Sequence, residues 1–434
     1  MSELLARHRA VIPNWVGIYY DEPIEIVSGK GCRVTDGQGR SYLDFFAGIL
    51  TNMLGYDVPE VRDAVERQIA SGVVHTSTLY LIRNQVELAE KIARLSGIDN
   101  AKVFFTNSGT EANETALLAA LTARGASQVL AMRGSYHGRS FGAVSVTGVA
   151  AWKMSSHDPF GTHYLHGTDR QLPQYRQLSD ADYVKACVED LRALLGAAIH
   201  PADVACLLAE PIQGVGGFTM PPDGLLAAYK EVLDEHGILL VSDEVQTGWG
   251  RTGEHFWGIS AHGITPDAMT FAKGLGNGFA IGGVVARGEL LDGIRGNSIS
   301  TFGGNPVATA AGNATLDYVL SHDLQRSAAV TGRLIIDGIS QAAAALDIVG
   351  DVRGKGLMFA VDLVDPATRK PSPPLAARML EATKERGLLV GKGGLYGHTL
   401  RMAPPLTLTE AEAKEGLGIL TDALIAVNSE VVGR

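Results

Sequence analysis

The chain of 434 residues has few cysteines and no long apolar run. Cys32, Cys187 and Cys206 are odd in number and far apart, which predicts reduced thiols and neither a disulfide framework nor a zinc site. No stretch approaches the roughly 20 apolar residues of a membrane span. The first residues, MSELLARHR, lack the apolar core of a signal peptide. We therefore expect a soluble protein of the cytoplasm.

The chain also lacks blocks of like charge. Its formal net charge is −10, which argues against nucleic acid or an anionic membrane surface as the main partner. Hydrophobic residues make up 46% of the sequence, so the chain can bury a large core. Its length is sufficient for two domains.

Short apolar runs alternate with longer helical patterns between about residues 100 and 310. The segment 110–124 is rich in Ala and Leu, begins with Thr110 and Glu111, and is followed by Gly125, which predicts a helix. This alternation indicates an α/β domain with a mostly parallel sheet. The predicted strands, several of them apolar on both faces, are Val103–Thr106, Val129–Arg133, Val204–Ala209, Ile238–Ser242, Ala268–Phe271 and Gly282–Ala286.

The two flanks of this region have a different pattern. Residues 24–46 predict a small hairpin unit with a turn at Asp36-Gly37. From about residue 326 the pattern predicts a helix, a strand pair around Ile348–Val364, another helix and the strand Thr399–Ala403, which suggests a second, smaller domain. We place the domain boundaries at residues 1–60, 61–325 and 326–434.

Lys273 lies between the apolar run 268–272 and the small-residue loop GLGNG at 274–278. Most lysines are solvated, but such a loop lets a bulky ligand approach, and burial there would suit the amine to Schiff-base chemistry. A dinucleotide loop is the weaker alternative, because the spacing is not G-x-G-x-x-G.

Asp243 ends the apolar run 238–242, and strand ends are where open α/β sheets bind ligands. A helix cap or a metal ligand are alternatives, but no His/Cys cluster accompanies it, so we expect no metal. An amine and a carboxylate in one pocket are what pyridoxal 5′-phosphate (PLP) needs, because the cofactor forms a Schiff base and its pyridine nitrogen stays protonated. The neighbouring Glu244 should face the opposite way and have a structural role.

Two further segments could contact a flat phosphorylated cofactor. The segment 107–113 precedes and opens a predicted helix, where free N–H groups and the hydroxyl of Thr110 could bind phosphate; an ordinary N-cap is the alternative. Tyr136 follows a strand and could stack on the cofactor, although such aromatics are more often core. His137 could be a general base, but we assign it a structural role because Lys273 already fills that function.

Arg401 lies in an otherwise apolar stretch and needs a partner if it is buried. A substrate carboxylate and a structural salt bridge are both open at this point. Glu210 ends another buried strand and is a possible partner. Thr301 could add a hydroxyl to the site, although its surroundings indicate only a loop.

These motifs together resemble the class III aminotransferases, which are PLP enzymes of fold type I. Within this family, the segments 75–78, 210–214, 348–358 and 387–390 are most similar to the mitochondrial-type alanine–glyoxylate aminotransferases. The family resemblance covers the chain from about Asn14 to the last strand and rests on motifs that occur in the family's order: Asn107–Asn113, Tyr136–Gly138, Glu210-Pro211, Asp243–Gly253, Ala272–Gly278, Thr301–Pro306 and Arg401–Pro405.

The resemblance implies a large domain with a mostly parallel seven-stranded sheet between helices, and a smaller α+β domain built from both termini. It also implies a homodimer with shared active sites, or a dimer of such dimers. For the cofactor, the resemblance implies a Schiff base on Lys273, a pyridine-nitrogen partner in Asp243, ring contacts from Val245 and Tyr136, and a hydrogen bond from Gln246 to the phenolic oxygen. It implies that Gly109 and Thr110 bind the phosphate together with Thr301, which comes from a second subunit. For the substrate, it implies that Arg401 binds the α-carboxylate, that Glu210 pairs with Arg401 when the amine has no such carboxylate, and that Tyr19 lies at the mouth of the site.

The expected activity is amino transfer by a ping-pong mechanism. The donor would be a small amino acid (alanine, or a β- or ω-amino acid), and the acceptor would be glyoxylate, pyruvate or 2-oxoglutarate. One alternative is a 4-aminobutyrate- or ornithine-type ω-aminotransferase. Another is a PLP decarboxylase or racemase on the same fold, which would keep Lys273 and Asp243 but need no keto acid.

Overall fold

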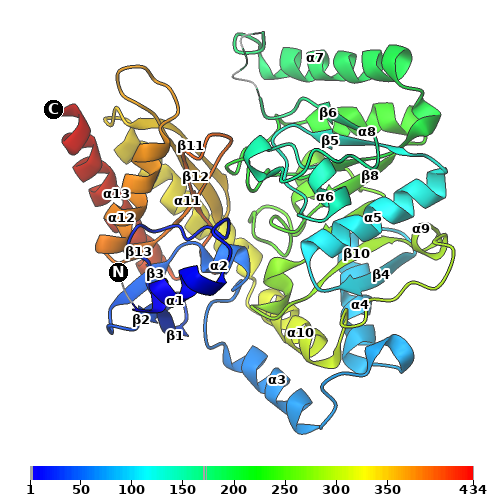
Figure 1. Cartoon of the computed structure of the whole chain (residues 1–434), viewed down its shortest axis with the longest axis horizontal. Coiled ribbons are helices and arrows are strands. Elements are labelled where there is room, and N and C mark those ends of the chain that lie inside the picture. Colours follow the sequence, from blue (N-terminus) through cyan, green and yellow to red (C-terminus); the bar gives the residue numbers. More distant parts are fainter. Residues whose placement is uncertain (1–2, 170–171, 173, 434) are drawn as a thin grey trace.

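The structure, a computed structural model, describes residues 3–169, 172 and 174–433. Figure 1 shows a larger lobe around one sheet and a smaller lobe that carries both α1 (Glu3–Val11) and α13 (Glu410–Val432), the helices near the two ends of the chain. The chain therefore has the predicted fold class, an α/β protein with a smaller α+β part contributed by both termini.

The large sheet has seven strands in the order β4-β10-β9-β8-β7-β5-β6. Neighbouring strands from β9 to β6 are parallel, whereas β10 is antiparallel to both β4 and β9. The sheet is thus mostly parallel, and β10 alone runs against the other strands. Its strands are β4 (Ala101–Thr106), β5 (Gln128–Met132), β6 (Thr162–Leu165), β7 (Val204–Ala209), β8 (Leu239–Asp243), β9 (Ala268–Phe271) and β10 (Gly282–Arg287).

All strands of this sheet except β6 were predicted, with ends within two residues of the observed ones. The edge strand β6 has the sequence Thr-His-Tyr-Leu, and three of its four residues are half-buried. It therefore lacks the continuous apolar run by which buried strands are recognised. Its pairing with β5 is a tertiary contact, which periodicity does not reveal.

Helices cover both faces of the large sheet, so its strands are buried on both sides. In β7, Leu207 packs into one apolar cluster and Leu208 into another on the opposite face. The Leu208 cluster includes the alanines of α5, and the Leu207 cluster includes side chains of α7 and α8. Helices of this lobe are α3 (Pro59–Ala70), α4 (Arg83–Ser96), α5 (Gly109–Arg124), α6 (Phe141–Ser145), α7 (Asp180–Ala193), α8 (Leu225–Glu235), α9 (Gly288–Asp292) and α10 (Pro306–Ser321).

The smaller lobe contains two four-stranded sheets. One of them joins the ends of the chain, because β13 pairs in parallel with β3 through Leu388 and Leu43. The predicted domain boundaries fall within the first turns of α3 and α11. The remaining elements are β1 (Ile26–Lys30), β2 (Arg33–Asp36), β3 (Ser41–Asp44), α2 (Ala47–Leu50), α11 (Leu324–Ala343), β11 (Val349–Lys355), β12 (Met358–Leu363), α12 (Pro373–Glu385), β13 (Leu388–Leu389), β14 (Gly391–Gly393) and β15 (Thr399–Met402).

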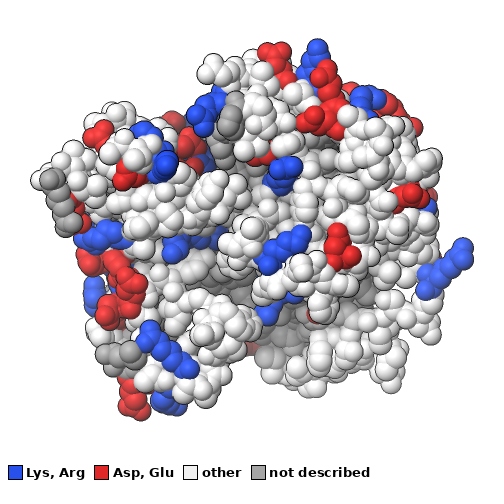
Figure 2. Space-filling model, turned by 45° about the horizontal axis from the view of Figure 1, so that its top comes forward, with Lys and Arg blue, Asp and Glu red and all other residues white. Residues whose placement is uncertain are grey.

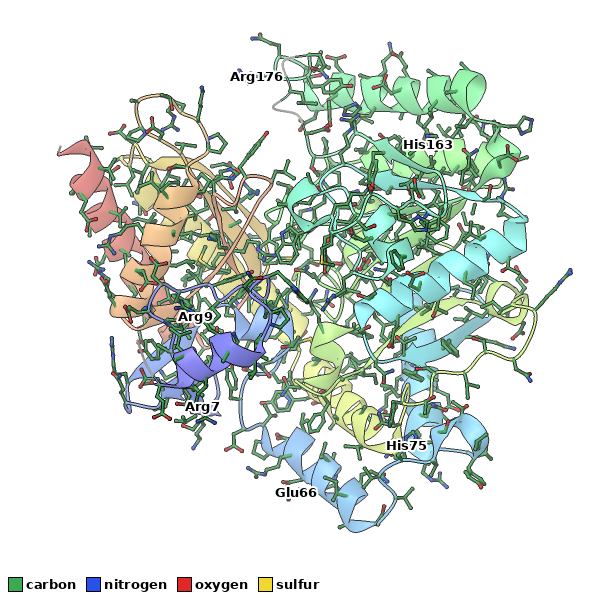
Figure 3. The ribbon with its side chains drawn as sticks, in the orientation of Figure 1. Arg7, Arg9, Glu66, His75, His163 and Arg176 are labelled. Atoms are coloured by element: carbon green, nitrogen blue, oxygen red, sulfur yellow. The ribbon has the colours of Figure 1, made fainter. Side chains whose placement is uncertain are left out.

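Charged side chains of both signs are interspersed on the surface. On the face drawn in Figure 2, blue and red groups alternate and wide areas carry no charge. Figure 3 places Glu66 of α3 and Arg176 at opposite outer edges of the larger lobe. In the described part of the chain, no helix is both long and apolar enough to cross a bilayer.

Two glycines of α13 offer a matched test of this packing. A Cβ at Gly416 would lie 2.2 Å from the ring of the fully buried Phe45, whereas one at Gly418 would meet nothing within 4 Å. We expect Gly416→Ala to lower the free energy of unfolding by about 1–3 kcal/mol through overpacking. Gly418→Ala should raise it by about 0.5–1 kcal/mol, because alanine loses less backbone entropy. Urea denaturation of both variants checks the prediction, and equal effects would contradict it.

Candidate active site

The candidate site lies where the parallel strands of the large sheet end. Residues that follow β4, β5, β7 and β9, together with the end of β8, meet in one pocket at the carboxyl edge of the sheet. Open α/β sheets bind their ligands at this edge. The pocket is lined by Gly109, Thr110, Asn113, Tyr136, His137, Gly138, Glu210, Asp243, Val245, Gln246 and Lys273.

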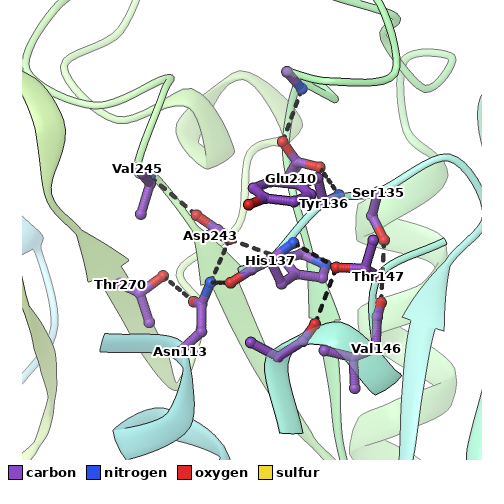
Figure 4. A network of polar contacts seen from close by, with 12 residues as sticks. Asn113, Ser135, Tyr136, His137, Val146, Thr147, Glu210, Asp243, Val245 and Thr270 are labelled. Carbon is purple, nitrogen blue, oxygen red and sulfur yellow. Dashed lines mark hydrogen bonds and ion pairs between the residues drawn. The ribbon is translucent and has the colours of Figure 1, made fainter. Parts of the chain in front are cut away.

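Asp243 is buried, and its two carboxylate oxygens accept hydrogen bonds from three groups (Figure 4). Asn113 Nδ2 and His137 Nδ1 both lie 2.8 Å from Oδ2, and the Val245 amide donates to Oδ1 at 3.1 Å. These bonds hold the carboxylate in one orientation at the floor of the pocket. A negative charge fixed in this way attracts a positively charged ring nitrogen.

Sequence reasoning missed Asn113 and gave His137 only a structural role. Thr270 Oγ1 donates to Asn113 Oδ1 at 2.7 Å, which fixes the amide so that its nitrogen faces Asp243 and the His137 carbonyl. A spacing signal was available, because Asn113 follows Gly109 by one helical turn and so shares its face of α5. The contact between His137, in the loop after β5, and Asp243, at the end of β8, joins distant segments, which the sequence does not reveal.

Lys273 occupies the first position of a short 3-10 helix, Lys273–Gly276, that follows β9. Its φ of +42° lies in the left-handed region, which a residue with a side chain adopts at a cost in energy and which is common at functional sites. Burial lowers the pKa of Lys273 to about 8, against the opposing charges of Asp243 and Glu210. A substantial fraction of the amine is therefore neutral, and nucleophilic, near physiological pH.

The start of α5 forms an anion-binding corner in the same pocket as Lys273 and Asp243. Ser108 Oγ caps the helix by accepting from the Glu111 amide at 3.2 Å, and the preceding amides of Gly109 and Thr110 belong to the open first turn. A Cβ at Gly138, whose φ is +137°, would lie 2.6 Å from Thr110 Oγ1. The backbone thus approaches the corner more closely than a side chain would allow.

The groups present fit PLP. The corner at Gly109 and Thr110 suits its phosphate, Asp243 suits its ring nitrogen, and Lys273 supplies the amine. The amide of Gln246 is buried, and its Oε1 has no hydrogen-bond partner among the described residues, so this group is available to a polar atom of a ligand. Val245 and Tyr136 line the same pocket, and they offer an apolar side chain and an aromatic ring for packing against the ring of the cofactor.

Glu210 is a second buried carboxylate in the lining of the pocket, besides Asp243. It accepts hydrogen bonds from the amides of Tyr136 and Gly214, each at 2.8 Å. Burial raises the pKa of Glu210 to about 7, although the charge of His137 opposes this shift. Glu210 therefore gains or loses a proton near neutral pH.

Arg401 lies outside the pocket lining but close to it. Its Nη1 donates to the Gly214 carbonyl at 2.9 Å, and Nε and Nη2 donate to the Lys392 carbonyl at 3.2 and 3.0 Å. Its guanidinium lies 5.3 Å from the ring centre of Phe46. Within residues 3–169, 172 and 174–433, no acidic side chain forms an ion pair with Arg401. Besides these dipoles and aromatic faces, Tyr19 and, at longer range, the carboxylate of Glu210 stabilise the buried charge of Arg401.

Tyr19 and Thr301 also lie outside the pocket lining. Tyr19 is half-buried against Phe46, with ring centres 6.1 Å apart, and it contacts Arg401. Thr301 is exposed on a loop before α10. Its neighbour Phe302 packs on His75, with ring centres 4.7 Å apart, and Figure 3 places His75 at the edge of the larger lobe. A single chain therefore does not bring Thr301 to the pocket.

Glu244 faces away from the pocket, as the alternation of a strand predicts. Its carboxylate is fully buried and accepts hydrogen bonds from the amides of Gly258 and Ile259, each at 2.8 Å, and from two hydroxyl groups. It anchors the loop after β8 and has the structural role expected for it. In the described part of the chain, no cluster of three or more His, Cys, Asp or Glu side chains is arranged to hold a metal.

A mostly parallel sheet whose strand ends bring together a buried amine, an oriented carboxylate and a helix N-terminus defines a PLP-dependent enzyme of fold type I. The family "Aminotransferase class-III" matches residues 19–424, and the chain belongs to this family. It is accordingly a PLP-dependent transaminase, which moves an amino group from an amino acid to a keto acid.

Curated relatives and solved structures agree with this assignment. The chain is 37% identical to alanine–glyoxylate aminotransferase 2 homolog 2, mitochondrial, of Arabidopsis thaliana over 94% of this chain and 84% of the relative. It is 39% identical to the acetylornithine aminotransferase of Mycolicibacterium smegmatis, covering 94% and 95%. Its fold matches a PLP-bound amine transaminase from an uncultivated Pseudomonas species with a TM-score of 0.88 at 29% identity, covering 97% and 98%. It also matches a phospholyase from Arthrobacter in complex with phosphoethanolamine with a TM-score of 0.88 at 35% identity, covering 98% and 100%.

The adjacent acids Asp243 and Glu244 give a matched pair of variants. We expect both Asp243→Asn and Glu244→Gln to destabilise the fold by about 1–3 kcal/mol, because each new amide faces buried donors. Asp243→Asn should in addition lower kcat by about 10²- to 10³-fold in the folded protein, because it removes a fixed charge from the reaction site, whereas Glu244→Gln should keep kcat. Thermal unfolding and steady-state kinetics measure the two effects, and a loss of kcat in Glu244→Gln but not in Asp243→Asn would contradict these roles.

Proposed function

We propose that the protein transfers the amino group of a small amino acid, such as alanine or a β- or ω-amino acid, to glyoxylate, pyruvate or 2-oxoglutarate. The observation that carries this proposal is Arg401, a buried cation that forms no direct ion pair among the described residues, beside the pocket of Lys273 and Asp243. A buried guanidinium gains most from a carboxylate that binds it through two hydrogen bonds. An amino acid and a keto acid both supply that carboxylate.

Bound PLP supplies an electron sink for the bond that breaks at the donor's Cα. Lys273 Nζ is the base that takes the α-proton, because its lowered pKa leaves much of the amine neutral near pH 8. Asp243 provides the fixed negative charge at the pocket floor, and Asn113 and His137 keep it in place. In the second half-reaction the same groups act in the reverse order on a keto acid, which gives ping-pong kinetics.

Glu210 and Arg401 would together decide which end of a substrate is accepted. The two side chains are joined through Gly214, whose amide donates to Glu210 and whose carbonyl accepts from Arg401. With an α-carboxylate bound, Arg401 is neutralised by the substrate. With an amine that lacks this group, the ionised form of Glu210 would balance the charge of Arg401, and Tyr19 would line the mouth of the site.

The names of the relatives support a small amino donor but leave two groups of substrates. The alanine–glyoxylate aminotransferase of Arabidopsis thaliana supports alanine and glyoxylate. The acetylornithine aminotransferase of Mycolicibacterium smegmatis supports an ω-amino donor, which is also the substrate of the 4-aminobutyrate- and ornithine-type alternative. We favour the first group because the segments 75–78 and 210–214 resemble it.

A phospholyase activity is a second candidate, favoured by one observation. The phospholyase structure in complex with phosphoethanolamine is 35% identical to this chain, whereas the PLP-bound amine transaminase is 29% identical. Such a reaction would use the same lysine and carboxylate but would need no keto acid. Release of inorganic phosphate from phosphoethanolamine, measured without a keto acid, separates this candidate from transamination.

A screen of amino donors against three keto acids tests the proposed function. We expect L-alanine or a β- or ω-amino acid to be converted with pyruvate, glyoxylate or 2-oxoglutarate, and we expect Lys273→Ala to lose at least about 10³-fold in kcat because the base is gone. Lys185→Ala, which removes an exposed lysine of α7, is the control and should keep full activity. Transamination that persists in Lys273→Ala would sink the assignment.

We further propose that the working enzyme is a homodimer located in the cytoplasm. Large apolar side chains are exposed near Thr301, among them Phe302 (60%) and Ile299 (61%), and others are exposed on the segment 79–81, where Leu81 is 98% exposed. Apolar groups gathered in this way favour burial against a second copy. The three cysteines are free, buried thiols, which fits a reducing compartment.

Mixed dimers test whether Thr301 completes the site of the partner subunit. A dimer of one Lys273→Ala chain and one Thr301→Ala chain would keep one site with both native residues, so we expect about half of the wild-type activity per dimer. Chains with two different affinity tags allow this dimer to be purified and assayed beside each parent. Activity no higher than the mean of the two parent dimers would show that Thr301 does not act across the interface.

A further inference from the structure

Two arginines from the smaller lobe hold one turn of the larger lobe. This turn, residues 213–219, is called the glycine turn below and contains Gly214, Gly216 and Gly217. Arg401 Nη1 donates to the Gly214 carbonyl at 2.9 Å. Arg353 of β11 donates to the Gly217 carbonyl through Nε at 3.0 Å and Nη2 at 2.6 Å. The planar guanidinium of Arg353 thus grips one carbonyl oxygen with two of its N–H groups.

The backbone of the glycine turn allows Arg353 to approach the Gly217 carbonyl because residue 217 has no side chain. Gly217 has a φ of +106°, a conformation that favours glycine. A Cβ at this position would lie 3.1 Å from Arg353 Nη2, from Gly394 Cα and from Thr399 Oγ1. A side chain here would therefore push the turn away from the arginine.

Arg353 is itself locked in place by carboxylates. Asp362 of β12 accepts from Nη1 and Nη2, each at 2.8 Å, and Asp351 accepts from Nη1 at 2.6 Å. Thr399 Oγ1 donates to Asp362 Oδ1 at 2.5 Å. A two-bond pair of this kind restricts an arginine far more than a single contact does. Because Thr399 and Arg401 lie on the same strand, β15, the two arginines share one rigid support.

The position of the glycine turn decides the surroundings of two site residues. Gly214 donates its N–H to Glu210 Oε2 at 2.8 Å and offers its carbonyl to Arg401. A shift of the turn would displace both contacts at once. Arg353 does not line the pocket, so it can affect the site only through the turn.

We propose that Arg353 is a positioning residue for substrate carboxylates: by holding the Gly217 carbonyl, it fixes the glycine turn and thereby the orientation of Arg401. This inference rests on the proposed function, in which Arg401 binds the carboxylate.

Arg353→Lys in the holoenzyme tests the proposal. Lysine keeps the positive charge for Asp362 but lacks the planar guanidinium that donates two hydrogen bonds to the Gly217 carbonyl. We expect KM for L-alanine and for pyruvate to rise about 5- to 20-fold with kcat within about twofold, because binding is weakened and the chemical groups are intact. Arg369→Lys is the matched control, since Arg369 also binds two main-chain carbonyls, those of Asp347 and Val349, neither of which belongs to the glycine turn; it should keep both constants.

Wild-type KM in Arg353→Lys, or a fall in kcat without a rise in KM, would overturn the positioning role. If circular dichroism shows that this variant is unfolded, Thr399→Val replaces it, and a rise in KM of about 2- to 3-fold is expected because one bond to Asp362 is lost. An unchanged KM in that variant would equally overturn the role.

Arg401→Lys, measured in parallel, separates failure of this inference from failure of the proposed function. If Arg401→Lys raises KM and Arg353→Lys does not, only the positioning role is wrong. If neither variant changes KM, the carboxylate site itself is wrong. Should the wild type not turn over L-alanine, the dissociation constant of pyruvate, followed by the visible absorbance of the bound cofactor, takes the place of KM in the same comparison.

Discussion

The contact of Asp243 with Asn113, His137 and the Val245 amide is the interaction on which the rest of the site depends. A carboxylate can remain buried only if its oxygens are satisfied, and here the three donors come from α5, from the loop after β5 and from the loop after β8. The same contacts fix the ends of three elements at one corner of the sheet. The pocket is therefore a consequence of satisfying one buried charge.

The opposite wall of the pocket depends on the meeting of the two lobes. Glu210 of the larger lobe lines the pocket, and behind it the glycine turn is held by Arg353 and Arg401 of the smaller lobe, which do not line the pocket themselves. Both arginines donate to main-chain carbonyls of the glycine turn. These contacts therefore depend on where the backbone of the turn lies and not on which side chains it carries. In the proposed mechanism, a change in the glycine turn would therefore alter which substrates bind without altering Lys273 and Asp243.

The sequence predicted the sheet, and it predicted that Lys273 and Asp243 would share one pocket, because both predictions depend on local patterns. Buried strands appear as apolar runs, and Lys273 and Asp243 follow two of them directly. What could not be predicted depends on contacts between distant segments: the edge strand β6, the hydrogen bond of His137 to Asp243, and the carbonyl partners of Arg401. Thr301 illustrates a further limit, because its proposed role needs a second chain. Resemblance to a family indicated roles for Arg401 and Thr301, but the hydrogen-bond partners of Arg401 follow only from the three-dimensional arrangement.

Reduction of the holoenzyme with borohydride, followed by peptide mass spectrometry, tests the central claim most directly. We propose Lys273, with its pKa lowered to about 8 by burial, as the amine that binds the cofactor covalently in the pocket it shares with Asp243. We therefore predict a phosphopyridoxyl group on the peptide that contains Lys273 and on no other lysine. A modified peptide from elsewhere in the chain, or no modification of a preparation that contains PLP, would contradict it.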